Sequence, residues 1–139
     1  MFAAALLSVG ATACAAALTP EAATGPAAMA DAATVTLQPG ESARPAGIAT
    51  TVTLTEVRDD SRCPAGTDCV WAGDATVAVH VAPDGRPART VLLHLSSEDA
   101  RTAEVSGLRI RLESLRPERQ ANTNLNRDDY RVTLSLSRP

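Results

Sequence analysis

The sequence predicts an all-β fold, an antiparallel β-sandwich of immunoglobulin-like or related type with about seven strands. Two observations predict it. After residue 33, apolar and polar residues alternate with a period of two along several segments that are rich in Val, Thr, Ile and Leu. Turn residues such as Pro39-Gly40 and Pro83-Asp84-Gly85 separate these segments. Helical patterns do not alternate with them, so a parallel α/β fold is not expected.

The alternating segments predict the strands in chain order. They are residues 33–37, 48–57, 77–81, 91–95, 108–115 and 130–136. Val57 falls out of phase with the residues before it, which predicts a β-bulge near Glu56. The third and fourth segments flank a Pro-Asp-Gly turn and are expected to form a hairpin. Ser96-Ser97-Glu98-Asp99 is expected to cap a short helical turn that runs to Ala103.

The N-terminal region predicts export. Residues 1–13 are small or apolar and uncharged, as in a signal peptide, although the usual positive n-region is missing. We favour a start codon further upstream over a segment that is no signal. Ala11-Thr12-Ala13-Cys14 resembles the lipobox of bacterial lipoproteins, which implies a lipid on Cys14. The alternative is cleavage at an Ala-x-Ala site with loss of Cys14. Residues 14–32 are then a flexible Ala- and Pro-rich tether, and residues 33–139 are the β-domain.

Composition excludes one class of partner. The net charge is −3, and the positive residues, all Arg, are scattered along the chain. A nucleic-acid partner is therefore not expected. Beyond the leader the only aromatic residues are Trp71 and Tyr130, too few for a platform that stacks bases or sugars.

The most specific segment runs from Asp59 to Gly73. Its Asp-Ser-Arg-Cys-Pro and Cys-Val-Trp-Ala-Gly motifs resemble the core of a family of uncharacterised bacterial secreted proteins and lipoproteins. The resemblance implies a β-domain in the cell envelope and carries over no activity. Cys63 and Cys69 enclose Pro64 and Gly66, which suit a tight reversal, and in an oxidising compartment the two cysteines should pair. Trp71 is expected to cover this disulfide or the end of the sandwich.

The same segment supplies the candidate binding residues. They are Asp59, Asp60, Arg62, Asp68, Trp71 and Asp74. Its acids bracket the loop and would suit Ca²⁺, but their spacing fits no EF-hand, and solvated or ion-paired acids are the favoured interpretation. Arg62 beside a disulfide would suit a protease-inhibitor-like loop. The cysteine pair lacks the further ligands of a closed zinc site and the Cys-x-x-Cys spacing of a thiol–disulfide active site.

Two histidines need separate consideration. If Val79 pairs with Leu93, His80 and His94 are diagonal neighbours on the outer face, and a surface metal would suit them. We favour an exposed pair without metal.

The sequence contains no catalytic, cofactor or metal motif. The leading hypothesis is a non-enzymatic module, anchored in the envelope by lipid or else secreted, that binds an envelope protein or small ligand or has a structural role. A metal-binding periplasmic or surface protein is the alternative.

Overall fold

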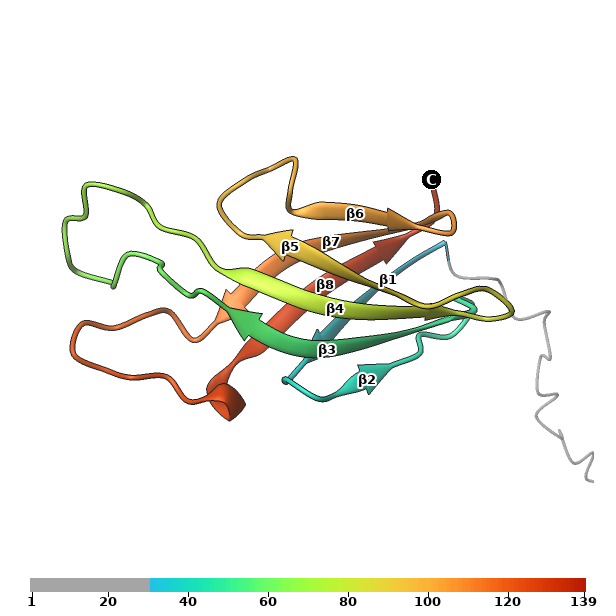
Figure 1. Ribbon diagram of the computed structural model, residues 1–139, viewed down its shortest axis with the longest axis horizontal. Helices are drawn as coiled ribbons and strands as arrows, with labels where there is room; N and C mark the ends of the chain where they lie inside the picture. Colours follow the sequence, from blue (N-terminus) through green and yellow to red (C-terminus); the bar gives the residue numbers. More distant parts are fainter. Residues whose placement is uncertain (1–30) are drawn as a thin grey trace, which may run out of the picture.

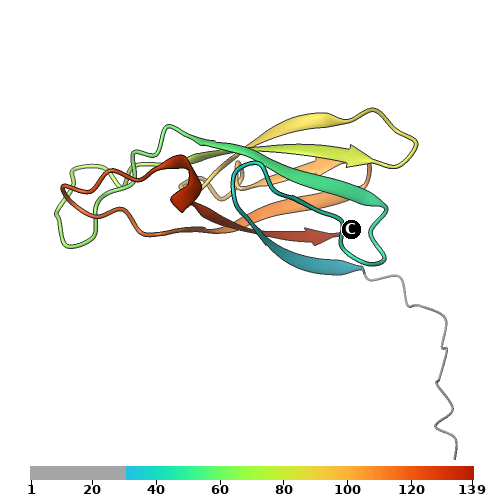
Figure 2. The ribbon, with the colours of Figure 1, turned by 90° about the horizontal axis from the view of Figure 1, so that it is seen from below.

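A computed structural model describes residues 31–139 (Figures 1 and 2). The predicted signal peptide, Cys14 and nearly all of the predicted tether lie outside the described residues. Ala32, the last residue assigned to the tether, already belongs to the first strand. Among residues 31–139 there is no helix long and apolar enough to cross a membrane.

The chain forms an antiparallel β-sandwich of two four-stranded sheets, as the sequence predicts. One sheet has the order β1-β8-β7-β6 and the other the order β2-β3-β4-β5. The elements are β1 (Ala32–Leu37), β2 (Ser42–Ala43), β3 (Thr50–Arg58), β4 (Thr76–Pro83), β5 (Arg89–His94), β6 (Thr102–Val105), β7 (Leu108–Arg116), the 3-10 helix η1 (Arg127–Asp129) and β8 (Arg131–Ser137). Each strand pair is antiparallel.

The core fills the space between the two sheets with aliphatic side chains. The alternation read from the sequence sends every second residue of β3, β7 and β8 inward. The largest fully buried side chains are Val52, Leu54, Val77, Val79, Val81, Leu93, Ile110, Leu112, Val132, Leu134 and Leu136. Burial of these side chains is the main stabilising contribution to the domain.

Two β-bulges reset the alternation near one end of the sandwich. The predicted bulge in β3 is confirmed, because the pairing with β4 shifts between Leu54 and Glu56. A second bulge lies in β7, where the pairing with β8 shifts between Leu112 and Ser114. The extra residue returns Leu115, which is out of phase in the sequence, to the core. Both bulges lie in strands that lead into long loops.

The structure has eight strands, in line with the prediction of about seven. The six segments read from the sequence correspond to six of them, and the other two, β2 and β6, are short and carry little alternation. One sequence prediction needs correction. The predicted helical turn up to Ala103 is wrong. Residues 98–101 form a turn, in which the backbone N–H of Ala100 bonds to the hydroxyl of Ser97, and β6 begins at Thr102. The capping hydrogen bond exists, but pairing with β7 replaces the helix after one turn.

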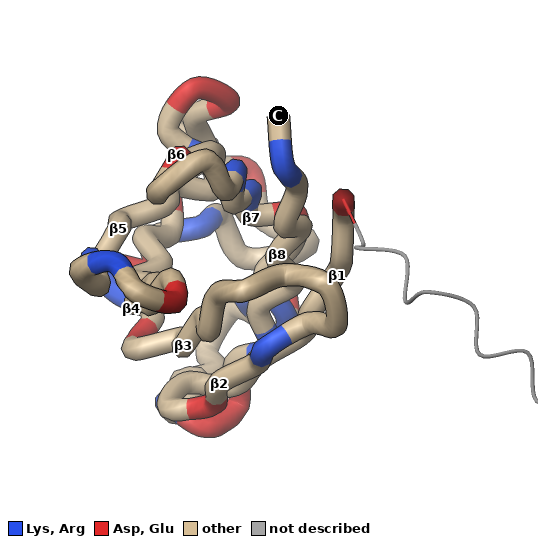
Figure 3. Tube along the Cα trace, turned by 90° about the vertical axis from the view of Figure 1, so that its right-hand side faces the viewer, with Lys and Arg blue, Asp and Glu red and all other residues tan. Residues whose placement is uncertain are grey.

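The sandwich has two distinct ends. The start of β1, the end of β8 and the β4–β5 and β6–β7 turns lie at one end, on the right of Figure 1. The long β3–β4 and β7–β8 loops lie at the other end, as Figure 2 also shows. Charged residues of both signs are scattered over the end where β1 starts and β8 ends (Figure 3). The loop end contains the segment that the sequence singles out.

Candidate functional site: the disulfide loop and its anchors

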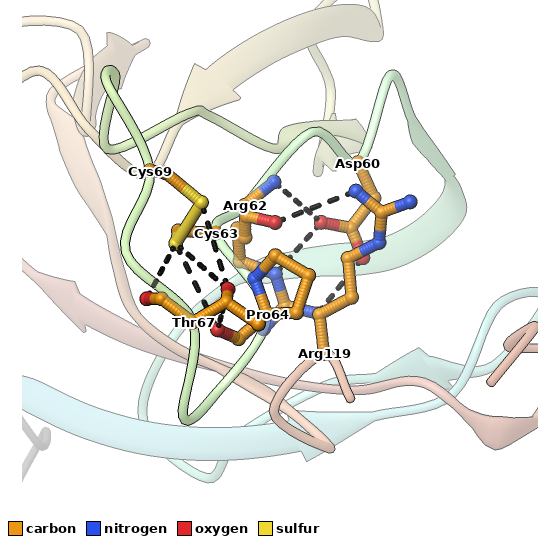
Figure 4. Close-up of a disulfide and its surroundings, with 7 residues drawn as sticks. All are labelled: Asp60, Arg62, Cys63, Pro64, Thr67, Cys69 and Arg119. Carbon is orange, nitrogen blue, oxygen red and sulfur yellow. Dashed lines mark hydrogen bonds and ion pairs between the residues drawn. A yellow bond between two sulfur atoms is a disulfide. The ribbon is translucent and has the colours of Figure 1, made fainter. Parts of the chain in front are cut away.

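The candidate site is the loop from Asp59 to Ala75, which joins β3 to β4. The predicted Cys63–Cys69 disulfide is confirmed, with the two Cα atoms 6.0 Å apart (Figure 4). Asp59 has a φ of 48°, a left-handed conformation that Asp tolerates better than most residues. This residue turns the chain out of β3 and into the loop.

A tight turn lies inside the disulfide ring. The backbone N–H and the hydroxyl of Thr67 both donate to the carbonyl of Pro64, at 3.2 and 2.7 Å. Gly66 has a φ of 76°, as the third residue of a type II turn requires. In this reversal the carbonyl of Pro64 accepts the two hydrogen bonds, and Gly66 supplies the positive φ.

Residues 61–63 and 72–74 form the stem of the loop, and backbone hydrogen bonds hold these two segments together. The N–H of Ser61 donates to the carbonyl of Asp74 at 2.7 Å, and the N–H of Cys63 donates to that of Ala72 at 3.1 Å. Gly73 permits this approach, because a Cβ at this position would lie 1.8 Å from the carbonyl oxygen of Ser61. Only glycine fits there.

A buried ion pair fixes the stem to the sandwich. The guanidinium of Arg62 forms two hydrogen bonds of 2.8 Å with the carboxylate of Asp60. It also donates to the backbone carbonyls of Leu115 and Pro117, each at 3.0 Å. The side chains of Arg62 and Asp60 are only 12% and 9% exposed. A bidentate pair of this kind is strong and directional, so it fixes the stem against the end of β7.

Tyr130, which lies between η1 and β8, completes this network. Its hydroxyl donates to a carboxylate oxygen of Asp60 at 3.0 Å. Burial alone would raise the pKa of Asp60, but hydrogen bonds from Arg62 and Tyr130 outweigh it and lower the pKa. The hydrogen bond to Asp60 in turn raises the pKa of Arg62. Burial, followed by the hydrogen bond to Asp60, raises the pKa of Tyr130.

The neighbouring β7–β8 loop also supports the disulfide loop. The N–H of Ala65 donates to the carbonyl of Arg119 at 2.7 Å, and the Arg119 guanidinium donates to the carbonyl of Arg62 at 3.4 Å. The two loops border an open polar pocket of about 170 Å³, lined by Asp60, Arg119, Thr123, Asn124, Leu125 and Tyr130. The loops thus form one connected unit at this end of the sandwich.

A second carboxylate holds the other side of the stem. Asp74 lies 2.8 Å from the Nδ1 of His94 and accepts a 2.8 Å hydrogen bond from the N–H of Ser96. Burial alone would raise the pKa of Asp74, but the hydrogen bonds from Ser96 and His94 outweigh it and lower the pKa to about 2. Asp74 therefore connects the end of the loop to the end of β5.

The structure separates the predicted binding residues into three groups. Asp60 and Arg62 form one network and Asp74 belongs to another. Asp59, Asp68 and Trp71 are exposed. The calcium hypothesis has no geometric support, because residues 31–139 contain no group of three or more potential metal ligands.

Two expectations for single residues are corrected. Trp71 does not cover the disulfide or the sandwich, since it is 81% exposed and Val70 beside it is 91% exposed. Arg62 does not present itself as an inhibitor residue would, because its guanidinium is turned inward onto Asp60. The large apolar side chains that the loop exposes are those of Val70 and Trp71.

The histidines are further apart than the sequence analysis supposed. Val79 pairs with Val91, two residues from the assumed register. His80 therefore lies opposite Thr90 and His94 opposite Thr76, four residues away along β4, a spacing of about 13 Å. A metal bridge between the two histidines is not supported by this geometry.

Sequence reasoning missed the partners of the loop. Tyr130, Arg119 and His94 come from distant strands and loops, and no local motif marks them. One signal was present, since the unusual length of the β7–β8 connection indicates a loop with a role of its own. Comparison of this chain with protein-family models, with curated proteins and with solved structures found no match.

Proposed function

We propose that this chain is an exported, non-enzymatic binding or structural module of the bacterial cell envelope that uses the disulfide loop as its contact surface. One observation carries the proposal. Val70 and Trp71 are highly exposed on a loop that a disulfide, a buried ion pair and a neighbouring loop hold in place. Adjacent exposed apolar side chains on a fixed loop are typical of binding surfaces.

Export is supported by the disulfide and by the N-terminal sequence. Disulfides form and persist in oxidising compartments outside the cytoplasm. The uncharged leader and the resemblance of residues 11–14 to a lipobox favour export with a lipid on Cys14. The resemblance of the loop motif to secreted proteins and lipoproteins favours the same location. In this proposal the domain is anchored through its N-terminal segment, and a secreted form arises if Cys14 is removed.

Metabolic labelling tests the anchor. Cells of the native host are grown with an alkyne fatty acid, and the full chain is recovered and examined for label. The wild type should be labelled, and Cys14→Ala should not be. Equal labelling of both proteins, or none on the wild type, would reject the lipid.

Trapping of thiols tests export directly. Intact host cells are treated with an alkylating reagent before lysis, and Cys63 and Cys69 are examined by mass spectrometry. The proposal expects the peptide with both cysteines to be disulfide-linked and unalkylated. Two alkylated thiols in freshly lysed cells would show that the chain remains in a reducing compartment.

A further inference from the structure

We infer that the tip of the disulfide loop, residues 68–71, docks into an apolar socket bordered by cationic groups on another exported protein. This inference rests on the proposed function, because it names the class of partner that the displayed loop would contact. Four features of the tip carry it: its apolar side chains, the contacts that fix the loop, its place opposite the start of β1, and its charge.

The apolar character of the tip is unusual for this molecule. Within residues 31–139 three large hydrophobic side chains are exposed, and two of them, Val70 and Trp71, are neighbours at the tip. The third, Leu92, lies alone on β5 and is 49% exposed. An indole provides a large apolar area with few rotatable bonds, and Trp is enriched among residues that dominate protein interfaces. The tip therefore matches the kind of side chain that fills a socket.

The tip is also positioned before any partner arrives. The disulfide closes the loop, the bond from Cys63 to Ala72 closes the stem, and Ala65 is bonded to the β7–β8 loop. Ordering a mobile loop on binding costs conformational entropy, and these contacts reduce that cost. A fixed loop suits a partner that recognises one shape.

The direction of the tip disfavours the chain's own membrane as the partner. The loop lies at the end of the sandwich opposite the start of β1 (Figures 1 and 2). If the chain is anchored through Cys14, the predicted tether joins the domain at the start of β1, at the end opposite the tip. The point of attachment therefore does not hold the tip against that membrane, which favours a partner other than the membrane.

The charge at the tip selects the chemistry of that surface. Asp68 is the only charged residue between Cys63 and Asp74. Its exposed carboxylate is repelled by anionic lipid headgroups and attracted to Arg or Lys at the rim of a socket. A single ring is also a poor platform for sugars or bases, and the other ring of the domain, Tyr130, is hydrogen-bonded to Asp60. In a protein socket with a cationic rim, the indole of Trp71 would be buried and the carboxylate of Asp68 would pair with the rim.

Site-specific photo-cross-linking in the native host tests the inference. A benzophenone amino acid replaces Val70 in the full chain, and the same residue at Leu92 is the matched control on another exposed apolar position. We expect a light-dependent, protease-sensitive adduct of discrete mass from position 70 and none from position 92. In the position-70 variant, Trp71→Ala should lower the yield more than about tenfold, the loss expected for a central aromatic contact. Trp71→Phe should retain part of the yield.

Substitution at Asp68 tests the cationic rim. Asp68→Asn should lower the yield of the adduct, and Asp68→Lys should abolish it. The partner protein is identified from the adduct, purified in its free form and titrated against the wild-type chain. Trp71 is the only Trp of the sequence, so its fluorescence should shift to shorter wavelength on binding, and added salt should weaken the binding. Thermal melts confirm that each variant is folded, as expected for exposed positions.

The possible failures are distinguishable. An adduct with lipid or glycan, or a protein adduct that Asp68→Lys leaves unchanged, overturns the inference and leaves the loop as a contact surface. No adduct from position 70 in folded, normally abundant protein overturns the inference and the binding part of the proposed function together.

Discussion

The hydroxyl of Tyr130 donates a hydrogen bond to the carboxylate of Asp60, although the two residues lie 70 positions apart in the chain. The same carboxylate receives the bidentate bond from Arg62. One buried acid therefore joins the disulfide loop to the start of β8. The interactions around this acid can be tested separately.

Replacement of Arg62 by Met should be strongly destabilising. It leaves the largely buried Asp60 carboxylate with only the hydroxyl of Tyr130 and the backbone N–H of residue 62 as partners. Removal of one member of a buried ion pair typically costs about 3 kcal/mol. The free energy of unfolding, measured with urea at pH 7, checks this value. Arg44→Met is the control, because Arg44 forms an exposed ion pair with Asp84 and its loss should have little effect. Equal losses for both variants would contradict a structural role for the buried pair.

Tyr130→Phe should cost about 1–2 kcal/mol, since it removes one hydrogen bond to a charged acceptor and leaves the ring in place. The decisive measurement is a double-mutant cycle with Asp60→Asn. The two substitutions should be coupled, so that their combined effect on the free energy of unfolding is smaller than the sum of the single effects. Additive effects would show that the hydroxyl contributes nothing through Asp60.

Stability should fall in acid through Asp74. Its pKa is lowered to about 2 in the folded protein from an ordinary value of 3.8, so the unfolded chain takes up the proton first. The stabilisation by this carboxylate is complete above the ordinary value and is lost as the pH falls toward 2. For a partly exposed group it amounts to about 1–2 kcal/mol. Urea unfolding between pH 6 and pH 2 should show a shallower loss for Asp74→Asn than for the wild type. Asp99→Asn controls for the change in net charge, and the same slope in all three proteins would exclude Asp74 as a cause.

Gly73→Ala and Gly66→Ala form a matched pair. Both residues have a positive φ, which costs an alanine about 1–2 kcal/mol. At Gly66 the new Cβ meets nothing within 4 Å, so the cost should stop there. At Gly73 the Cβ collides with the backbone of Ser61, so the stem must open and the loss should be clearly larger. Thermal unfolding compares the two variants, and equal shifts in Tm would mean that the stem adjusts freely.

Loss of the disulfide should loosen the loop more than the sandwich. Opening so short a ring costs about 2 kcal/mol in the chain-entropy model. The ion pair of Asp60 and Arg62 does not depend on the sulfur atoms, so the stem should stay attached to β7. Hydrogen exchange of the Cys63→Ser, Cys69→Ser double variant should therefore accelerate within residues 64–72 and stay slow in β3 and β4. Fast exchange throughout both strands would show that the disulfide holds the whole sheet.

Alternation predicted the strands well where it was long. In β3, β7 and β8 a period of two places a row of Val, Leu and Ile on the core face, and both the strands and the bulge in β3 could be located. The two-residue β2 and the four-residue β6 are too short for a period to appear. In β6 the capping residues favoured a helical turn, and pairing with β7 overrode that local preference.

The candidate site was predictable in its covalent part only. The spacing of Cys63 and Cys69 indicates a closed ring whatever surrounds it. The inward turn of Arg62 depends on carbonyl groups at Leu115 and Pro117, which a bulge in another strand brings into place. Trp71 lies in a loop without periodicity, so no alternation indicates whether its side chain faces the core or solvent. The orientation of the Arg62 side chain is set by contacts with residues more than 50 positions away, which a local pattern does not show.

Within the loop, the residues that hold the stem are different from those exposed to solvent, and this has an evolutionary consequence. The stem is held by Asp60, Arg62, Gly73 and Asp74, whereas Asp68, Val70 and Trp71 extend into solvent. Substitutions at the three outer positions leave the stem bonds untouched, so in the proposed binding role the contact residues can diversify without loss of the scaffold. The same separation makes this domain a candidate for grafting, in which foreign recognition sequences replace the outer residues.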